Sequence, residues 1–240
     1  MTTETDTTGT PEIHHTHRNV TGGWLRPAVF GASDGLISNF ALLSGVAGAH
    51  ASAHTISVTG IAGLIAGAFS MAAGEWVSVA SQSELTRAEI EIEKHELKHN
   101  AADEEHELAL MYQARGLDRD LAAKVAQQLS RDPEQAWRTH AREELGVDPD
   151  DLPSPWVAAG SSMVAFATGA FIPLLPFLLG ARNLLMAAIL AAVALFLLGA
   201  AVSRFTSRSW WFSGVRQLAV GAIAAAVTFG AGAALGTHLS

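Results

Sequence analysis

One carboxylate stands out in the first third of the sequence because almost everything around it is apolar or small. Asp34 is the only residue with a formal charge between Arg26 and Glu75. An ionisable side chain inside a bilayer is costly, and such a residue usually serves the movement of ions or protons. The alternative is a structural role, in which Asp34 caps a helix or accepts a buried hydrogen bond near Ser38 and Asn39.

A second group of carboxylates lies in the middle of the chain, in two Glu-x-x-Glu pairs. The pairs are Glu93 with Glu96 and Glu104 with Glu107. The i, i+3 spacing puts both carboxylates of a pair on one face of a helix. Divalent cations bind several oxygen ligands, so two pairs that face each other would hold one or more ions. The alternative is a solvated acidic helix whose carboxylates pair with nearby lysine and arginine side chains.

Two further side chains in the second apolar stretch are able to contact an ion. The thioether of Met71 is a soft ligand that favours transition metals over Mg²⁺ or Ca²⁺, although methionine also fills gaps in helical interiors. Glu75 follows one turn later, where it either passes ions between the acidic segment and the membrane or extends its carboxylate toward water.

Five stretches are long and apolar enough to cross about 30 Å of hydrocarbon as helices. They are residues 27–49, 55–80, 156–179, 183–203 and 210–237. Only 16% of the chain is charged, well below the roughly 25% of a soluble domain. Open chains span lipid only as helices, because their backbones must satisfy their own hydrogen bonds. The sequence therefore predicts an all-α integral membrane protein with five transmembrane helices.

Charged residues divide the chain sharply, since 18 of the 23 acidic residues lie between Glu84 and Asp151. We predict four segments: a disordered cytoplasmic tail (1–22), transmembrane helices one and two (23–81), a cytoplasmic acidic helical metal-binding insert (82–153), and transmembrane helices three to five (154–240). The second apolar stretch runs into the insert without Gly or Pro, which predicts one long helix. Breaks at Gly116, at Asp132-Pro133 and at residues 146–149 predict about three short helices after it.

Most arginine and lysine side chains fall on one side if the N-terminus is cytoplasmic, and only Arg182 then lies outside. This predicts a cytoplasmic N-terminus and an external C-terminus. The chain has no cysteine, which excludes disulfides and thiolate metal sites, and no basic cluster that would bind nucleic acid. The first 20 or so residues lack the pattern of a signal peptide, and their His14, His15 and His17 fit a flexible tail better than a metal site.

Three motifs and the acidic insert together resemble the vacuolar iron transporter family. The motifs are Ser33-Asp34-Gly35-Leu36, the run from Gly67 to Trp76 with Met71 and Glu75, and Gly169-Ala-Phe-Ile-Pro173-Leu-Leu-Pro176. The similarity runs from about residue 20 to the C-terminus. It implies a five-helix homodimer that exports Fe²⁺, and often Mn²⁺, from the cytoplasm in exchange for protons.

The resemblance also assigns roles to residues of this chain. The translocation carboxylate of the family falls on Asp34, and its methionine in the second helix falls on Met71. The metal-binding glutamates of the family correspond to Glu93, Glu96, Glu104, Glu107 and Glu144.

This chain departs from plant members of the family at a few positions. Two adjacent methionines of the plant proteins correspond to His140 and Ala141, and His140 is a candidate substitute ligand. A glutamate early in the second helix of plant members is Gly63 here, while Glu75 often corresponds to glycine in them. The Gly-Glu-Trp run around Glu75 is similar to bacterial and nodulin-like members.

A minimal antiport mechanism follows from a lone buried carboxylate. Asp34 favours its protonated form when empty, and metal binding requires the proton to leave, so proton and metal displace each other. We expect a transporter of Fe²⁺ or Mn²⁺, with no cofactor besides the transported ion, in a bacterial plasma membrane. The alternatives are a membrane-anchored ferroxidase and a metal sensor or store without transport. A ferritin-type ferroxidase usually needs two Glu-x-x-His motifs, whereas the insert offers one, Glu96 with His99.

Overall fold

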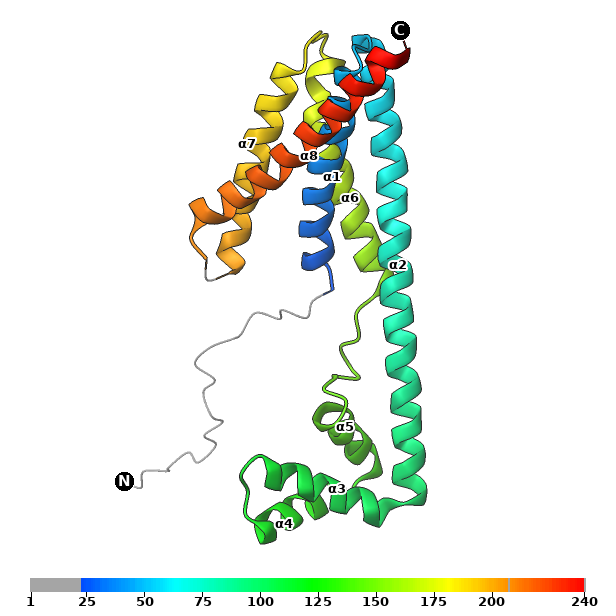
Figure 1. Cartoon of the computed structure of the whole chain (residues 1–240). Coiled ribbons are helices and arrows are strands. Elements are labelled where there is room, and N and C mark those ends of the chain that lie inside the picture. Colours follow the sequence, from blue (N-terminus) through cyan, green and yellow to red (C-terminus); the bar gives the residue numbers. More distant parts are fainter. Residues whose placement is uncertain (1–22, 207, 240) are drawn as a thin grey trace, which may run out of the picture.

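A computed structural model describes residues 23–206 and 208–239, which form helices and turns and contain no strand. The predicted all-α class is confirmed for this part of the chain (Figure 1). In chain order the helices are α1 (Leu25–Gly48), α2 (Ala53–His99), α3 (Ala101–Ala114), α4 (Arg119–Leu129), α5 (Pro133–Glu143), α6 (Pro155–Leu178), α7 (Leu185–Val202), the 3₁₀ turn η1 (Ser203–Phe205) and α8 (Trp210–Leu239). The tail with its three histidines lies outside the described residues.

Five of the described helices are long and apolar enough to cross a membrane, namely α1, α2, α6, α7 and α8. They correspond to the five predicted stretches, and most of their ends agree within about two residues. The exception is α2, whose 47 residues continue from the bundle to the insert. Figure 1 shows this helix as the single long rod between the two parts of the molecule. The expected continuation of the second helix is therefore confirmed.

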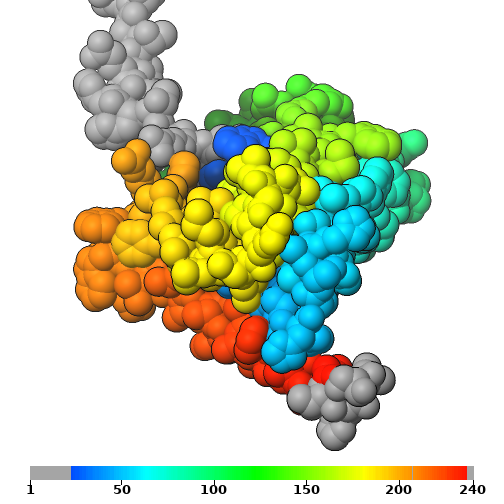
Figure 2. Space-filling view, turned by 90° about the horizontal axis from the view of Figure 1, so that it is seen from above, coloured from blue at the N-terminus to red at the C-terminus, as the bar shows by residue number. Residues whose placement is uncertain are grey.

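The bundle is centred on α1, which packs against α6 on one side and α8 on another. Glycines allow these helices to approach closely. An added Cβ at Gly35 would overlap the carbonyl oxygen of Phe166 in α6, and one at Gly232 of α8 would overlap that of Gly45. Figure 2, which looks onto the end of the bundle opposite the insert, shows the α6–α7 turn beside the start of α2. Gly35 and Gly232 thus serve close packing of helices within one chain.

The insert consists of the lower half of α2 and the three short helices α3, α4 and α5 (Figure 1). The predicted breaks are present: Gly116 and Gly146 adopt positive φ angles of 103° and 66°, and Pro133 begins α5 after the cap Asp132. The sequence did not predict the turn at Asn100 that separates α2 from α3. This turn lacks both Gly and Pro, and Asn100 alone separates the two helices.

Exposed tryptophans mark the level at which the bundle meets the insert. Trp76 of α2 and Trp156 at the start of α6 pack edge to face with ring centroids 5.7 Å apart. Trp24 and Trp210 are also exposed at the starts of α1 and α8. Tryptophan concentrates at membrane interfaces, so this level is the expected edge of the hydrocarbon. Glu93 lies 17 residues beyond Trp76, about 25 Å along α2, and is therefore well outside the spanning part.

Candidate metal centre and bundle cavity

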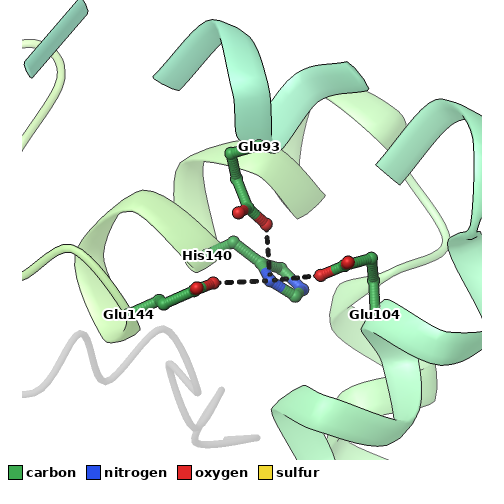
Figure 3. Close-up of side chains that lie close together, drawn as sticks. All are labelled: Glu93, Glu104, His140 and Glu144. Carbon is green, nitrogen blue, oxygen red and sulfur yellow. Dashed lines mark ion pairs between the residues drawn. The ribbon is translucent and has the colours of Figure 1, made fainter. Parts of the chain in front are cut away.

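Four side chains of the insert converge from three helices on one point. Glu93 comes from α2, Glu104 from α3, His140 from α5, and Glu144 is the residue that caps the end of α5 (Figure 3). Each offers a ligand atom, and these atoms all lie within 4.8 Å of one another. Half of that span is about 2.4 Å, within the usual range of metal–oxygen bonds of about 2.0–2.6 Å.

Local sequence features place α5 so that His140 points into the cluster. The Asp132 carboxylate accepts a hydrogen bond from the backbone N–H of Glu134 at 2.9 Å, which fixes the start of the helix. Trp137 then packs under the ammonium of Lys94, whose Nζ lies 4.4 Å from the ring centroid, and this contact ties α5 to α2. His140 follows Trp137 by three residues, so its ring faces the same neighbouring helices.

The contacts of the His140 ring are short but are not hydrogen bonds. Its Nδ1 lies 2.9 Å from Glu93 Oε1, 3.6 Å from Glu104 Oε2 and 3.8 Å from Glu144 Oε2. His140 is fully buried and Glu93 is 7% exposed. Among the described residues, neither Nδ1 nor Glu93 Oε1 has a partner in hydrogen-bonding geometry. Buried polar atoms are nearly always satisfied, so this pair needs a further partner.

Burial raises the pKa of two carboxyl groups in the cluster and lowers the pKa of its imidazole. Burial, and then the neighbouring carboxylates Glu144 and Glu104, raise the pKa of Glu93 to about 7. Burial and the adjacent Glu107 also raise the pKa of Glu104. Burial lowers the pKa of His140, against the pull of Glu144. The imidazole is thus neutral and keeps a lone pair for a ligand, while the carboxylates repel each other until a cation joins them.

The donor set of the cluster is three carboxylates and one imidazole. Carboxylate and imidazole ligands suit divalent first-row metals such as Mn²⁺, Fe²⁺ and Zn²⁺, and no soft sulfur ligand is present in the cluster. A divalent cation would supply the partner that the buried oxygen of Glu93 and the ring nitrogen of His140 lack. The arrangement is therefore chemically suited to bind such an ion.

The remaining glutamates of the two predicted pairs lie next to the cluster but outside it. The Glu96 carboxylate accepts a hydrogen bond from the side-chain amide of Asn100, at the turn between α2 and α3. Glu107 is exposed and acts on the cluster through its charge, since it raises the pKa of both Glu93 and Glu104. One member of each pair thus faces the cluster at close range, because i and i+3 point about 60° apart around a helix.

A second candidate site is a cavity of about 520 Å³ in the bundle, between α1, α2 and α6. Asp34, Met71 and Glu75 all line it, so the structure brings together the three residues singled out in the spanning helices. The hydroxyl of Ser38 donates a hydrogen bond to the backbone carbonyl of Asp34 at 2.6 Å. The other lining residues are Arg26, Phe30, Asn39, Leu42, Gly63, Gly67, Ser70, Gly74, Ser78 and Phe166.

The wall that α2 contributes to the cavity is built from small residues. Gly63, Gly67, Ser70, Gly74 and Ser78 recur at spacings of three or four, which puts them on one helical face. This spacing is visible in the sequence and would have predicted a hollow face on the second helix. The polar lining residues Ser70 and Ser78 were missed because serine is common in helices and carries no charge.

Comparison with known proteins finds similarity over nearly the whole chain. The model of the VIT family matches residues 25–233. A protein of Acanthamoeba castellanii named vacuolar iron transporter is 37% identical over 223 residues, which cover 88% of this chain and 78% of that protein. Vacuolar iron transporter 1 of Arabidopsis thaliana is 33% identical, and the match covers 90% of this chain and 88% of that protein. Vacuolar iron transporter homolog 1 of Oryza sativa subsp. japonica is 35% identical, and the match covers 90% of this chain and 75% of that protein.

Proposed function

Since the chain belongs to the VIT family, we propose that it exports a divalent transition metal, Fe²⁺ or Mn²⁺, across a membrane in exchange for protons. Its relatives are named as transporters, which fits a protein that is not an enzyme. The metal is the transported substrate, and it first binds at the cluster of Glu93, Glu104, His140 and Glu144.

The observation that carries this proposal is the buried pair at the centre of the cluster. Glu93 Oε1 and His140 Nδ1 lie 2.9 Å apart without a hydrogen bond, and two more carboxylates lie within 4.8 Å. Such an arrangement is unfavourable without a cation and favourable with one. A cluster that only stabilised the insert would be expected to pair its carboxylates with arginine, as Glu143 of α5 does with Arg115 at the end of α3.

The cavity in the bundle is the proposed route through the membrane. Glu75 lies toward the insert, and 18 residues of unbroken helix, about 27 Å, separate it from Glu93. In this proposal Glu75 receives the ion, and Asp34 and Met71 bind it within the bundle. A carboxylate and a thioether form a mixed oxygen and sulfur site that favours transition metals.

Proton coupling is assigned to Asp34, because of the two carboxylates among the described residues that line the cavity, Asp34 and Glu75, it lies farther from the insert. A proton and a divalent cation compete for the same oxygens, so binding of one releases the other. Alternating exposure of Asp34 to the two sides of the membrane then exchanges protons for metal.

We further propose that the N-terminus and the insert are cytoplasmic and that the C-terminus is external. Arg204, Arg208 and Arg216 lie near the insert end of the bundle, where positive charge is expected on the cytoplasmic side. The composition favours a bacterial plasma membrane. We also propose a homodimer, which the resemblance to the family implies.

Transport is tested by reconstituting the full chain in liposomes and measuring the uptake of Fe²⁺ and, separately, Mn²⁺. An imposed proton gradient should drive uptake, and collapse of the gradient with a protonophore should stop it. The ratio of the two initial rates identifies the preferred metal. Absence of uptake of either metal, with metal still bound to the protein, would instead support a sensor or store.

The ferroxidase alternative has a separate test. The cluster contains neither Glu96 nor His99, the residues of the only Glu-x-x-His motif noted in the insert. Addition of Fe²⁺ to the protein in air should therefore produce no oxygen consumption above that of Fe²⁺ alone.

A further inference from the structure

One buried side-chain amide that lines the bundle cavity makes a hydrogen bond through its nitrogen but, among the described residues, none through its oxygen. Asn39 is 2% exposed and lines the cavity together with Asp34. Its Nδ2 donates a hydrogen bond to the carbonyl oxygen of Ala170 in α6 at 2.7 Å. Its Oδ1 is buried and has no hydrogen-bond partner among the described residues.

The orientation of this amide is fixed by its surroundings. The carbonyl oxygen of Ala170 is an acceptor only, so the NH₂ group of Asn39 must face it, and a flipped amide would set two oxygens against each other. The oxygen Oδ1 therefore points away from α6. It faces α2 at Gly63, where an added Cβ would lie 3.1 Å from Oδ1 and 2.5 Å from Leu42 Cδ2. Glycine at position 63 leaves that side of the oxygen free of a side chain.

A buried amide oxygen without a donor carries a free-energy cost that a hydrogen-bond donor or a cation would remove. Asn39 follows Asp34 by five residues, a rise of about 7.5 Å along α1 away from the insert. Of the residues of α1 that line the cavity beyond Asp34 in that direction, Ser38 already donates its hydroxyl to the Asp34 carbonyl, and Asn39 is the next one. Amide oxygens are accepted ligands of Mn²⁺ and other hard or borderline divalent cations.

We propose that Oδ1 of Asn39 is a ligand of a second cation position in the bundle, one step beyond Asp34 on the export path. The proposal rests on the proposed function of the cavity as the metal route. The amide is neutral, so it binds an ion more weakly than Asp34 does and releases it more readily. Its bond to Ala170 holds the oxygen in place while the ion passes.

The test is a calorimetric titration of the full-length protein with Mn²⁺, in a His140→Ala background that weakens binding at the insert. Asn39→Asp gives up the hydrogen bond to Ala170 but keeps an oxygen at the site and adds a charge, and the charge should raise Mn²⁺ affinity on the order of tenfold. Asn39→Leu has a similar size and no oxygen, so affinity should fall by a comparable factor. Ser162→Ala is the control, because Ser162 is buried with an unpartnered hydroxyl but does not line the cavity.

Each outcome decides the proposal. Tighter binding with Asp and weaker binding with Leu supports it, and an unchanged or reduced affinity with Asp overturns it. An equal loss of Mn²⁺ affinity in both variants would also overturn it, because it would show that Asn39 acts only through its hydrogen bond to Ala170. If the Leu variant does not fold, the Asp variant decides, and an unchanged affinity in a folded Leu variant also overturns the proposal. Failure of gradient-driven uptake by the unmodified protein would refute the transport proposal itself, whatever the titrations show.

Discussion

The two candidate sites of this protein differ in how many ligands they hold and in how those ligands are built. The cluster in the insert gathers four ligand atoms from three helices and buries its centre. The cavity in the bundle offers Asp34 and Met71, with Glu75 near the insert, on walls made largely of glycine and serine. A site with many fixed ligands retains an ion, whereas a site with few ligands lets it leave. Under the proposed function, capture and passage are therefore separate tasks of separate parts of the chain.

The strongest test of this division is the substitution Asp34→Asn. Gradient-driven metal uptake should fall by about 100-fold or more, since the lining carboxylate that lies farther from the insert loses its charge and its exchangeable proton. Glu93 of the cluster lies about 25 Å along α2 from the edge of the bundle at Trp76, so the tightest Mn²⁺ binding step should stay within about twofold. Uptake in proteoliposomes and calorimetry measure the two quantities. Equal losses in both would show that the two sites are one functional unit.

Removing the imidazole of the cluster should have the converse effect. His140→Ala deletes a fully buried ligand that contacts three carboxylates, and Mn²⁺ affinity should fall by on the order of 100-fold. His106→Ala, at an exposed histidine of α3 outside the cluster, is the matched control and should leave affinity unchanged. An affinity loss that is equal in the two variants would argue against His140 as a ligand.

The pH dependence of binding sharpens the comparison further, because burial raises the pKa of Glu93 to about 7. Below that pH the carboxylate holds a proton that metal must displace, so affinity should fall up to about tenfold per pH unit as pH decreases. The stability of the metal-free protein changes in the opposite direction with pH. Because the pKa of Glu93 is raised by folding, this stability falls as pH rises from about 4.5 through 7. Thermal unfolding without metal checks this, and Glu93→Gln should weaken both trends, leaving the part that Glu104 contributes through its own raised pKa.

The smallest expected effect concerns the rigidity of the cavity wall formed by α1. An added Cβ at Gly232 of α8 would overlap the backbone of Gly45, so Gly232→Ala should reduce unfolding stability by about 1–3 kcal/mol. Gly230 lies on the same helix with nothing within 4 Å of an added Cβ, and Gly230→Ala should stay within about 0.5 kcal/mol. Thermal unfolding in detergent compares them, and similar stabilities would show that α8 does not brace α1.

The sequence predicted the helices well because their signals are local. Apolar runs define the spanning segments, and Gly116, Pro133 and Gly146 mark the ends of the short helices. The turn at Asn100 was missed, because it contains neither Gly nor Pro. Local signals also suggested Asp34, Met71 and the paired glutamates as candidates.

Three-dimensional packing supplied what those signals lacked. The sequence does not reveal that His140 is fully buried against Glu93, since residues 47 positions apart meet only when α5 packs on α2. The same holds for Asn39, whose amide is oriented by a carbonyl 131 residues away. Similarity to the family suggested His140 as a substitute for methionine, and the structure places its ring within 3.8 Å of three carboxylates.

The central claim is that the insert captures metal and the bundle moves it. It is tested most directly by measuring the initial rate of Mn²⁺ uptake against Mn²⁺ concentration for the unmodified protein, His140→Ala and Asp34→Asn. The account predicts that His140→Ala raises the half-saturating concentration while most of the maximal rate remains, and that Asp34→Asn abolishes the rate at every concentration. A lost maximal rate in His140→Ala, or uptake by Asp34→Asn restored at high Mn²⁺, would contradict it.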